Sequence, residues 1–307
     1  MSANTWVPLP LERWGETYDT LHLWSQVVGK VRLEQTPWIN HSWHVPLYLT
    51  ARGLSTSLIP HDTRFFEMAF DLHDHQLVVR TSEGAVRTLP LRSMPVADFY
   101  FGVLRLLEEL DLEVDIWPVP VELPRPVQPF HEHEGEAAYD PEGARQLWQA
   151  LLQVHRVFTA FRARFIGKVS PVHLFWGAFD LAVTRFSGRP APTHPGGAPN
   201  VADWVMKEAY SHEVSSAGFF LSPELGDAAF YSYAYPEPEG FKDYDVRPAE
   251  AAYRQDLGEF VLPYEAVRTA SDPDAALLDF LQSTYEAAAD LAHWDRGALE
   301  GKLARSR

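Results

Sequence analysis

The chain contains no cysteine among its 307 residues. This absence excludes disulfide bonds, cysteine nucleophiles, iron–sulfur clusters and sulfur-ligated zinc, so any metal ion would have to be bound by His, Asp or Glu. Basic side chains are also scarce, since 26 Lys and Arg against 42 Asp and Glu give a formal net charge of −16. Because affinity for nucleic acids depends on Lys and Arg, we expect no nucleic-acid partner and no binding to an anionic membrane.

Long apolar runs are missing as well. The most apolar helix candidate, residues 99–110, is interrupted by Arg105, Glu108 and Glu109. A membrane-spanning helix needs roughly 18 or more consecutive apolar residues, so we expect no membrane span. Residues 1–11 lack the basic start and apolar core of a signal peptide, and the sequence therefore predicts a cytoplasmic protein.

The glycine motifs of the common cofactor folds do not occur. There is no G-x-G-x-x-G after a strand, no phosphate-binding glycine loop and no G-x-S-x-G motif. Nucleotide-binding and serine-hydrolase functions thus lose their usual support. The cofactor is unknown from the sequence, and the question whether the protein is an enzyme stays open.

The composition, 46% hydrophobic and 22% charged residues, is that of a globular protein. Apolar side chains recur at spacings of three and four in helices predicted at residues 16–33, 95–111, 140–167 and 272–294. Asp140-Pro141 and Asp272-Pro273 are strong helix-start signals. Short β-rich runs between these helices predict strands at residues 44–51, 54–59, 65–72, 76–81, 85–89, 172–186, 213–221, 228–235 and 260–262. The expected class is α+β, with mainly antiparallel sheets and flanking amphipathic helices.

A proline-rich stretch divides the chain. Residues 1–117 form a predicted N-terminal α+β half, 118–140 an extended surface connection, and 141–307 a C-terminal α+β half that carries the candidate site. Gly29-Lys30-Val31 has an echo in Gly167-Lys168-Val169, and a Trp precedes an Arg by nine positions after each tripeptide. These echoes raise the hypothesis of a pseudo-duplicated, two-lobed architecture.

The densest chemistry lies in the second half. Residues 175–186 are interpreted as one buried strand, in which Trp176, Asp180 and Thr184 share a face and Arg185 lies on the other. A carboxylate in such an apolar run needs a partner, because its burial is otherwise costly. An internal ion pair or a capped backbone is the simpler explanation of Asp180, and a ligand or catalytic contact is the alternative.

Two further clusters follow. His212 and Glu213 place an imidazole beside a carboxylate at a strand start, and adjacent strand residues point to opposite faces. Tyr231, Tyr233 and Tyr235 share a face just before Glu237, so that their rings could stack on a flat ligand or, alternatively, pack against a helix. The loop 188–200, which contains His194, is long enough to cover a pocket.

The segments Phe175-Trp176-Gly177 with residues 179–188, His212-Glu213 with residues 216–219, and Ala229-Phe230-Tyr231 with residues 233–238 resemble a bacterial family catalogued as domain of unknown function 5996. The likeness covers most of the chain, since residues 14–52 are also similar to the start of that family. Phe219-Phe220 stands where the family has a Phe-Trp pair. The resemblance implies no activity, because none is established for the family.

The leading hypothesis is a small-molecule-binding protein with its pocket in the C-terminal half and with enzymatic activity left open. The candidate catalytic residues are Asp180, His212 and Glu213, and the candidate ligand-binding residues are Trp176, Arg185, His194, Tyr231, Tyr233, Tyr235 and Glu237. One alternative is a non-catalytic interaction or scaffold protein. The other is a metal-dependent enzyme that uses the histidines of the first half, although their spacing assigns no metal ligand. The sequence leaves the oligomeric state and the identity of the ligand open.

Overall fold

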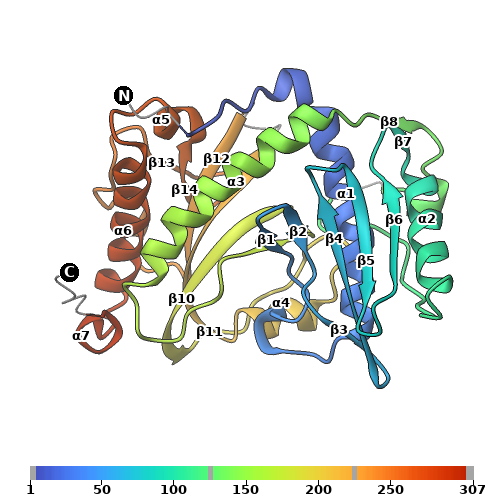
Figure 1. The fold of residues 1–307 in the computed structure, drawn as a ribbon. Coiled ribbons are helices and arrows are strands. Elements are labelled where there is room, and N and C mark those ends of the chain that lie inside the picture. Colours follow the sequence, from blue (N-terminus) through green and yellow to red (C-terminus); the bar gives the residue numbers. More distant parts are fainter. Residues whose placement is uncertain (1–4, 124–126, 223–226, 302–307) are drawn as a thin grey trace.

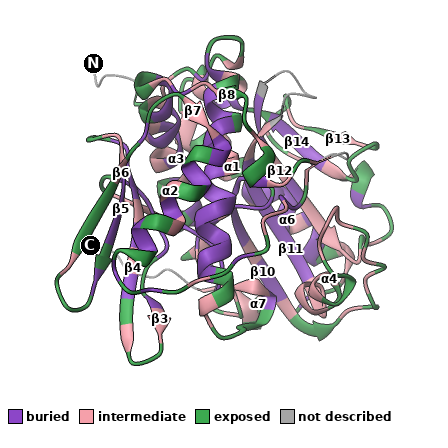
Figure 2. Cartoon of the chain, turned by 90° about the vertical axis from the view of Figure 1, so that its right-hand side faces the viewer, coloured by how far each residue is buried: buried purple, intermediate pink, exposed green. Residues whose placement is uncertain are grey.

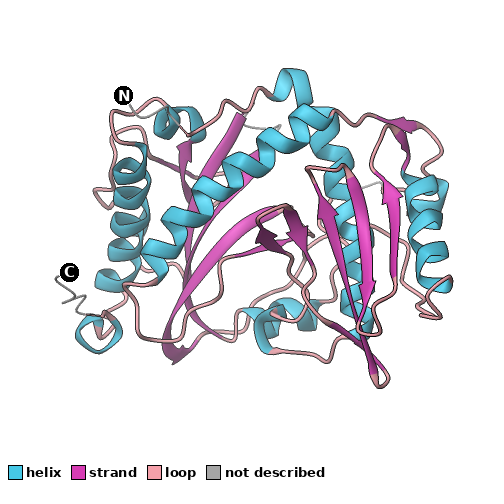
Figure 3. Ribbon diagram, in the orientation of Figure 1, coloured by secondary structure: helices cyan, strands magenta, loops and turns pink. Residues whose placement is uncertain are grey.

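The computed structural model describes residues 5–123, 127–222 and 227–301. Two segments used in the sequence predictions lie partly outside these ranges: residues 1–4 of the N-terminal segment 1–11, and prolines 124 and 126 of the predicted connection. Two antiparallel sheets, one in each half of the chain, make up most of the β structure (Figure 1). Helices flank both sheets, which confirms the predicted α+β class (Figure 3).

The first sheet is an antiparallel meander in the order β1-β2-β4-β5-β6, with β3 paired to one end of β4. Its strands are β1 (Tyr48–Thr50), β2 (Gly53–Ser55), β3 (Ile59–His61), β4 (Arg64–Asp71), β5 (Gln76–Thr81) and β6 (Val86–Pro90). Helix α2 (Val96–Glu108) begins after Pro95, as predicted, and flanks this sheet at the edge of the molecule (Figure 1).

The second sheet has the order β13-β14-β12-β11-β10-β9. Its strands are β9 (His173–Phe175), β10 (Asp180–Pro190), β11 (His212–Ser222), β12 (Asp227–Tyr235), β13 (Ala252–Arg254) and β14 (Glu259–Pro263). Backbone hydrogen bonds between Leu47 and Leu174, 2.8 Å in both directions, join this sheet to the segment that leads into the first.

The prediction of one strand over residues 172–186 is wrong. Residues 176–179 form a turn, and the segment folds back into the hairpin β9–β10 with Asp180 opposite Phe175. Phe179 adopts a positive φ of 56° at the end of this turn. The apolar composition of the run concealed the turn, because both arms of the hairpin are buried.

Two helices confirm their predicted start signals. The Asp140 carboxylate accepts hydrogen bonds from the backbone of Glu142 and Gly143 at the start of α3 (Pro141–Arg162), and Asp272 accepts one from Ala275 at the start of α6 (Pro273–Leu291). Both helices end several residues before the predicted ends at 167 and 294. The remaining elements are η1 (Asn40–Ser42), β7 (Met94–Pro95), η2 (Phe130–Glu132), β8 (Glu136–Ala137), α4 (Asp203–Ala209), η3 (Phe241–Asp243), α5 (Tyr264–Arg268) and α7 (Arg296–Leu299).

Helix α1 (Leu11–Gln35) differs from a flanking amphipathic helix. Every residue from Ser25 to Arg32 is buried, polar ones included, so the helix is enclosed on all sides over this stretch (Figure 2). It contacts α2, α3, β3 and β8. Because α1 runs through the interior, polar side chains on it must find partners or line an internal space.

The buried side chains of both halves form one continuous core. The proposed division at residues 118–140 and the duplication stay predictions. The echoed tripeptides lie in different surroundings, since Gly29–Val31 is inside α1 whereas Gly167–Val169 follows α3. Within the described residues, no helix is long and apolar enough to cross a bilayer.

Candidate functional site

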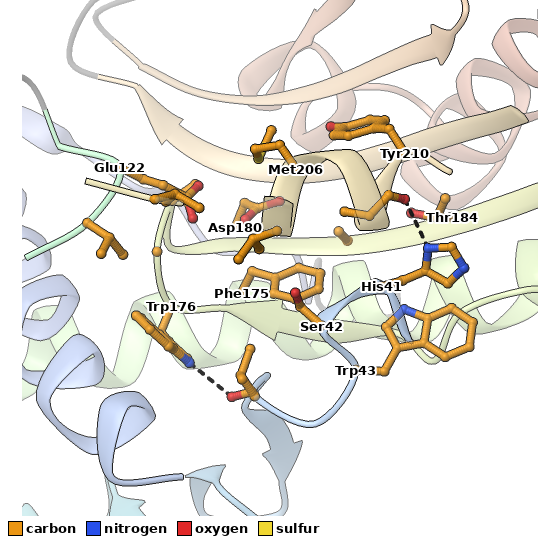
Figure 4. A pocket seen from close by; sticks show the side chains of 18 of the residues that line it. His41, Ser42, Trp43, Glu122, Phe175, Trp176, Asp180, Thr184, Met206 and Tyr210 are labelled. Atoms are coloured by element: carbon orange, nitrogen blue, oxygen red, sulfur yellow. Dashed lines mark hydrogen bonds between the residues drawn. The ribbon is translucent and has the colours of Figure 1, made fainter. Parts of the chain in front are cut away.

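A pocket of about 530 Å³ opens on one face of the second sheet (Figure 4). This volume lies within the range of roughly 300–1,000 Å³ that is typical of small-molecule sites. The floor comes from β10, β11 and β12, and the walls come from α1, η1, α4, the β9–β10 turn and residues 117–122. The pocket is rich in aromatic side chains: Trp38, Trp43, Trp117, Phe175, Trp176, Phe186, Tyr210, Tyr231 and Tyr233.

Strand alternation decides which side chains form the floor. On β10, Asp180, Ala182, Thr184 and Phe186 face the pocket, and Arg185 does not. Thr184 is registered with Ser216 on β11, which is registered with Tyr233 on β12. Hydrogen bonds follow this row, with 2.8 Å between the Thr184 and Ser216 hydroxyls and 2.8 Å between the Tyr233 and Tyr210 hydroxyls.

Asp180 is the buried carboxyl of the floor. The Tyr231 hydroxyl donates a hydrogen bond of 2.5 Å to Asp180 Oδ2. Burial raises the pKa of Asp180 to about 6, and the hydrogen bond from Tyr231 limits that rise. Tyr231 reaches across the floor because Gly218 has no side chain, since a Cβ atom there would lie 2.3 Å from the tyrosine ring.

Glu122 is the second carboxyl of the pocket, and it comes from the proline-rich segment. Its backbone nitrogen donates to Pro199 O at 2.8 Å, which ties this segment to the loop before α4. A Cβ atom on Gly177 would lie 2.2 Å from Glu122 Oε1, so the turn leaves space for the carboxyl. Glu122 lines the pocket and is exposed to solvent there. Desolvation by the surrounding protein, with the charge of Asp180, raises the pKa of Glu122 to about 7.

We call Glu122 and Asp180 the acidic end of the pocket. Figure 4 shows these two residues and Trp176 toward one end, with His41 and Trp43 toward the other. The indole nitrogen of Trp176 donates to Val45 O at 2.9 Å, and its ring packs on Gly29 of α1. The acidic end is therefore bounded by a fixed aromatic wall.

His41 marks the opposite end. Its Nδ1 is 2.9 Å from Ala209 O and therefore carries the proton, which leaves Nε2 to accept from Lys168 Nζ at 2.6 Å. Burial lowers the pKa of His41 below its usual value, and the charge of Lys168 adds to this effect. The imidazole is accordingly neutral and held between α4 and the segment after α3.

The comparisons with known proteins agree with the sequence resemblance. A model described as "Family of unknown function (DUF5996)" matches residues 6–301. The chain belongs to this family. No curated protein and no solved structure matches it. All the residues that line the pocket fall inside the span shared with the DUF5996 family.

Four of the ten residues selected from the sequence of this DUF5996 member line the pocket: Trp176, Asp180, Tyr231 and Tyr233. Three others lie beside it. His194 stacks on Tyr210 with ring centroids 4.5 Å apart, Tyr235 donates to Pro192 O, and the His212 ring lies 6.3 Å from that of His41. These contacts place the His194 loop against the pocket wall.

The other three residues lie away from the pocket. Arg185 is 1% exposed behind the sheet, where it donates to Phe161 O and lies over the rings of Phe161, Phe165 and Tyr285. Glu213 forms an ion pair of 2.7 Å with Arg189. Glu237 accepts a hydrogen bond from the Tyr253 hydroxyl. Each already has a partner within the protein.

Sequence reasoning missed Glu122, Lys30 and His41, all of which line the pocket. The segment that carries Glu122 was interpreted as a surface connection because of its prolines. A single carboxylate in the otherwise apolar run 116–123 was the signal that could have identified it. Among the described residues, no three His, Asp or Glu side chains lie close enough together to hold a metal ion, so the first-half histidines do not converge on one site.

Proposed function

We propose that the protein binds a small organic molecule that has a flat, apolar body and a protonated nitrogen. In this proposal the aromatic walls contact the body and the acidic end binds the nitrogen. The main observation in support is that two carboxyls, Glu122 and Asp180, line the same aromatic pocket and form no ion pair with any described residue.

Charge supports a cationic group at this end. Desolvation is the main cause of the raised pKa of Glu122 and of Glu259 on strand β14, each about 7, and the negative charge of Asp180 adds to both rises. Within the described part of the chain, no basic side chain contributes to the pKa of Asp180 or Glu122. A ligand ammonium or guanidinium between these carboxyls would stabilise their ionised forms.

The aromatic walls support the same ligand class. The rings of Tyr231 and Tyr233 lie parallel within 15°, with centroids 6.0 Å apart. Ring faces of Trp and Tyr attract both flat apolar groups and cations. A flat ligand with a positively charged nitrogen would satisfy both the walls and the acidic end.

The interaction-protein alternative stays a prediction. It depended on exposed aromatic strips, and Tyr231 and Tyr233 instead line the pocket. Trp38, which lines the pocket, packs on Trp204 at the pocket margin, and the two side chains are 40% and 56% exposed. This placement at a pocket margin favours ligand entry over a separate protein interface.

A matched pair of probes tests the proposal. Tryptamine and tryptophol share an indole ring and differ in an ammonium against a hydroxyl group. At about pH 8, where both carboxyls are ionised, we expect calorimetry to show tryptamine binding at least about tenfold more tightly, because charge-assisted hydrogen bonds exceed neutral ones by on the order of 1.4 kcal/mol.

The variants Glu122→Gln and Asp180→Asn should each reduce this preference. Glu213→Gln is the matched control, because its carboxylate is paired with Arg189 outside the pocket. The proposed function would be contradicted if neither probe bound the wild-type protein. It would also be contradicted if Glu213→Gln lost the preference for tryptamine as strongly as Glu122→Gln and Asp180→Asn.

A further inference from the structure

Lys30 is the one basic side chain, Lys or Arg, among the described residues that line the pocket. It lies between Gly29 and Val31 in the enclosed stretch of α1, residues 25–32, and is 4% exposed. The neighbouring positions Val27 and Val28 are 0% exposed. An ammonium group is therefore placed where the helix otherwise carries apolar side chains.

The Lys30 ammonium has no hydrogen bond and no ion pair with any described residue. Its Nζ lies 4.8 Å from the centroid of the Trp117 ring and 5.8 Å from that of Trp176. These rings compensate part of the cost of burying the charge, but they provide no hydrogen-bond acceptor. Burial alone lowers the pKa of Lys30 to about 8, with no contribution from Glu122 or Asp180.

Lys168 provides a contrast within the same region. Its Nζ lies 2.6 Å from His41 Nε2, so it supports the wall of the pocket from outside and does not line it. Lys30 makes no comparable hydrogen bond with a described residue of the pocket wall. If position 30 had only to fill space, an unbranched apolar side chain such as Met would pack there without the cost of an unpaired charge.

We propose that Lys30 binds a carboxylate of the ligand. This inference rests on the proposed function and adds a second charged group to the ligand. A ligand that uses both the acidic end and Lys30 carries a protonated nitrogen and a carboxylate on one flat, apolar body.

A carboxylate fits this position better than a phosphate. Phosphate groups in proteins are usually held by several donors, often by Arg in bidentate contacts. Lys30 offers one ammonium, and no Arg lines the described part of the pocket. A dianion would in addition be repelled by Glu122 and Asp180, which line the same pocket.

Indoleacetate and indoleacetamide test the inference, because they differ only in a carboxylate against a neutral amide. At about pH 7, where Lys30 is protonated, we expect the wild-type protein to bind indoleacetate at least about fivefold more tightly than indoleacetamide. The preference should vanish in Lys30→Met and in Lys30→Gln, and it should persist in Lys168→Met.

The tryptamine preference over tryptophol is measured on the same variants. It should persist in Lys30→Met, which shows that the variant is folded and the acidic end intact. The role of Lys30 is overturned if wild-type protein binds indoleacetate and indoleacetamide equally, or if the preference for indoleacetate persists in Lys30→Met. In either case the proposed function stands. Failure of all four indoles to bind wild-type protein overturns both.

Discussion

Gly29 and Trp176 come from distant parts of the sequence and lie in direct contact. A Cβ atom on Gly29 would lie 2.3 Å from the indole ring of Trp176. The missing side chain on α1 is thus what allows the indole to form a wall of the pocket and to donate to Val45 O. The same relationship occurs between Gly177 and Glu122 and between Gly218 and Tyr231.

Gly29→Ala should displace Trp176 and destabilise the protein by about 1–3 kcal/mol, the usual cost of overpacking a core. Gly15→Ala is the matched control, because Gly15 lies on the same helix with no atom within 4 Å of an added Cβ. We expect that control to retain or gain stability, since alanine favours helix. Urea denaturation compares the two variants, and equal losses of stability would argue against the tight Gly29–Trp176 contact.

Tyr231→Phe should raise the pKa of Asp180 above its value of about 6. The hydroxyl donates to the ionised carboxylate, and its removal leaves burial opposed only by the backbone hydrogen bond of Asp180. Tryptamine binding should then require a higher pH, which calorimetry across a pH series measures. Tyr235→Phe removes a hydroxyl that donates to Pro192 O outside the pocket and should leave the pH series unchanged.

The acidic end should also make stability depend on pH. Asp180 and Glu122 have folded-state pKa values of about 6 and about 7, above their usual values of 3.8 and 4.5. Between about pH 4 and pH 7 these two carboxyls therefore bind more protons in the folded than in the unfolded state, so their contribution to the free energy of unfolding falls as pH rises. Buried histidines such as His173, whose pKa burial lowers to about 3, contribute in the opposite direction, so the effect is measured as a difference between variants.

Asp180→Asn and Glu122→Gln should each remove one carboxyl's contribution, so the melting temperature of the wild type should fall relative to that of each variant as pH rises, and most relative to the double variant. Melting temperatures measured between about pH 4 and pH 8 check this, with Glu213→Gln as the control, because its carboxylate is already paired. A melting-temperature difference between wild type and the pocket variants that stays constant across the range would contradict the raised pKa values.

Arg185→Ala tests whether Arg185 stabilises the fold without contributing to ligand binding. The guanidinium packs over three aromatic rings behind the sheet and donates to Phe161 O near the end of α3. Its truncation should destabilise the protein by about 2–5 kcal/mol, as expected for a large buried cavity. The tryptamine affinity of the folded fraction, measured by titration below the melting range, should stay within about twofold of wild type. A loss of tryptamine affinity without a loss of stability would instead indicate that Arg185 takes part in ligand binding.

Local signals in the sequence were sufficient for much of the fold. The Asp140 and Asp272 caps, the start of α2 after Pro95 and the strands around 212–235 depend on neighbouring residues, and each is found as expected. The hairpin turn at 176–179 was missed because periodicity does not distinguish one long buried strand from two short ones.

The candidate site was predictable only in part, for a related reason. Asp180, Tyr231 and Tyr233 follow from alternation along strands of the second sheet. Glu122 and Lys30 reach the same pocket from a proline-rich segment and from a helix of the first half. Their convergence depends on tertiary packing, which a single sequence does not encode in any local pattern. Gly29 and Gly177 also make room for side chains that are distant in the sequence, whereas Gly218 acts on Tyr231 of the adjacent strand.

A crystal structure of the protein with tryptamine tests the central claim most directly. The account predicts the indole between the aromatic walls and the ammonium within hydrogen-bond distance, roughly 2.7–3.2 Å, of the Glu122 and Asp180 carboxyls. Tryptamine bound elsewhere on the protein, or bound in the pocket with its ammonium directed away from both carboxyls, would contradict it.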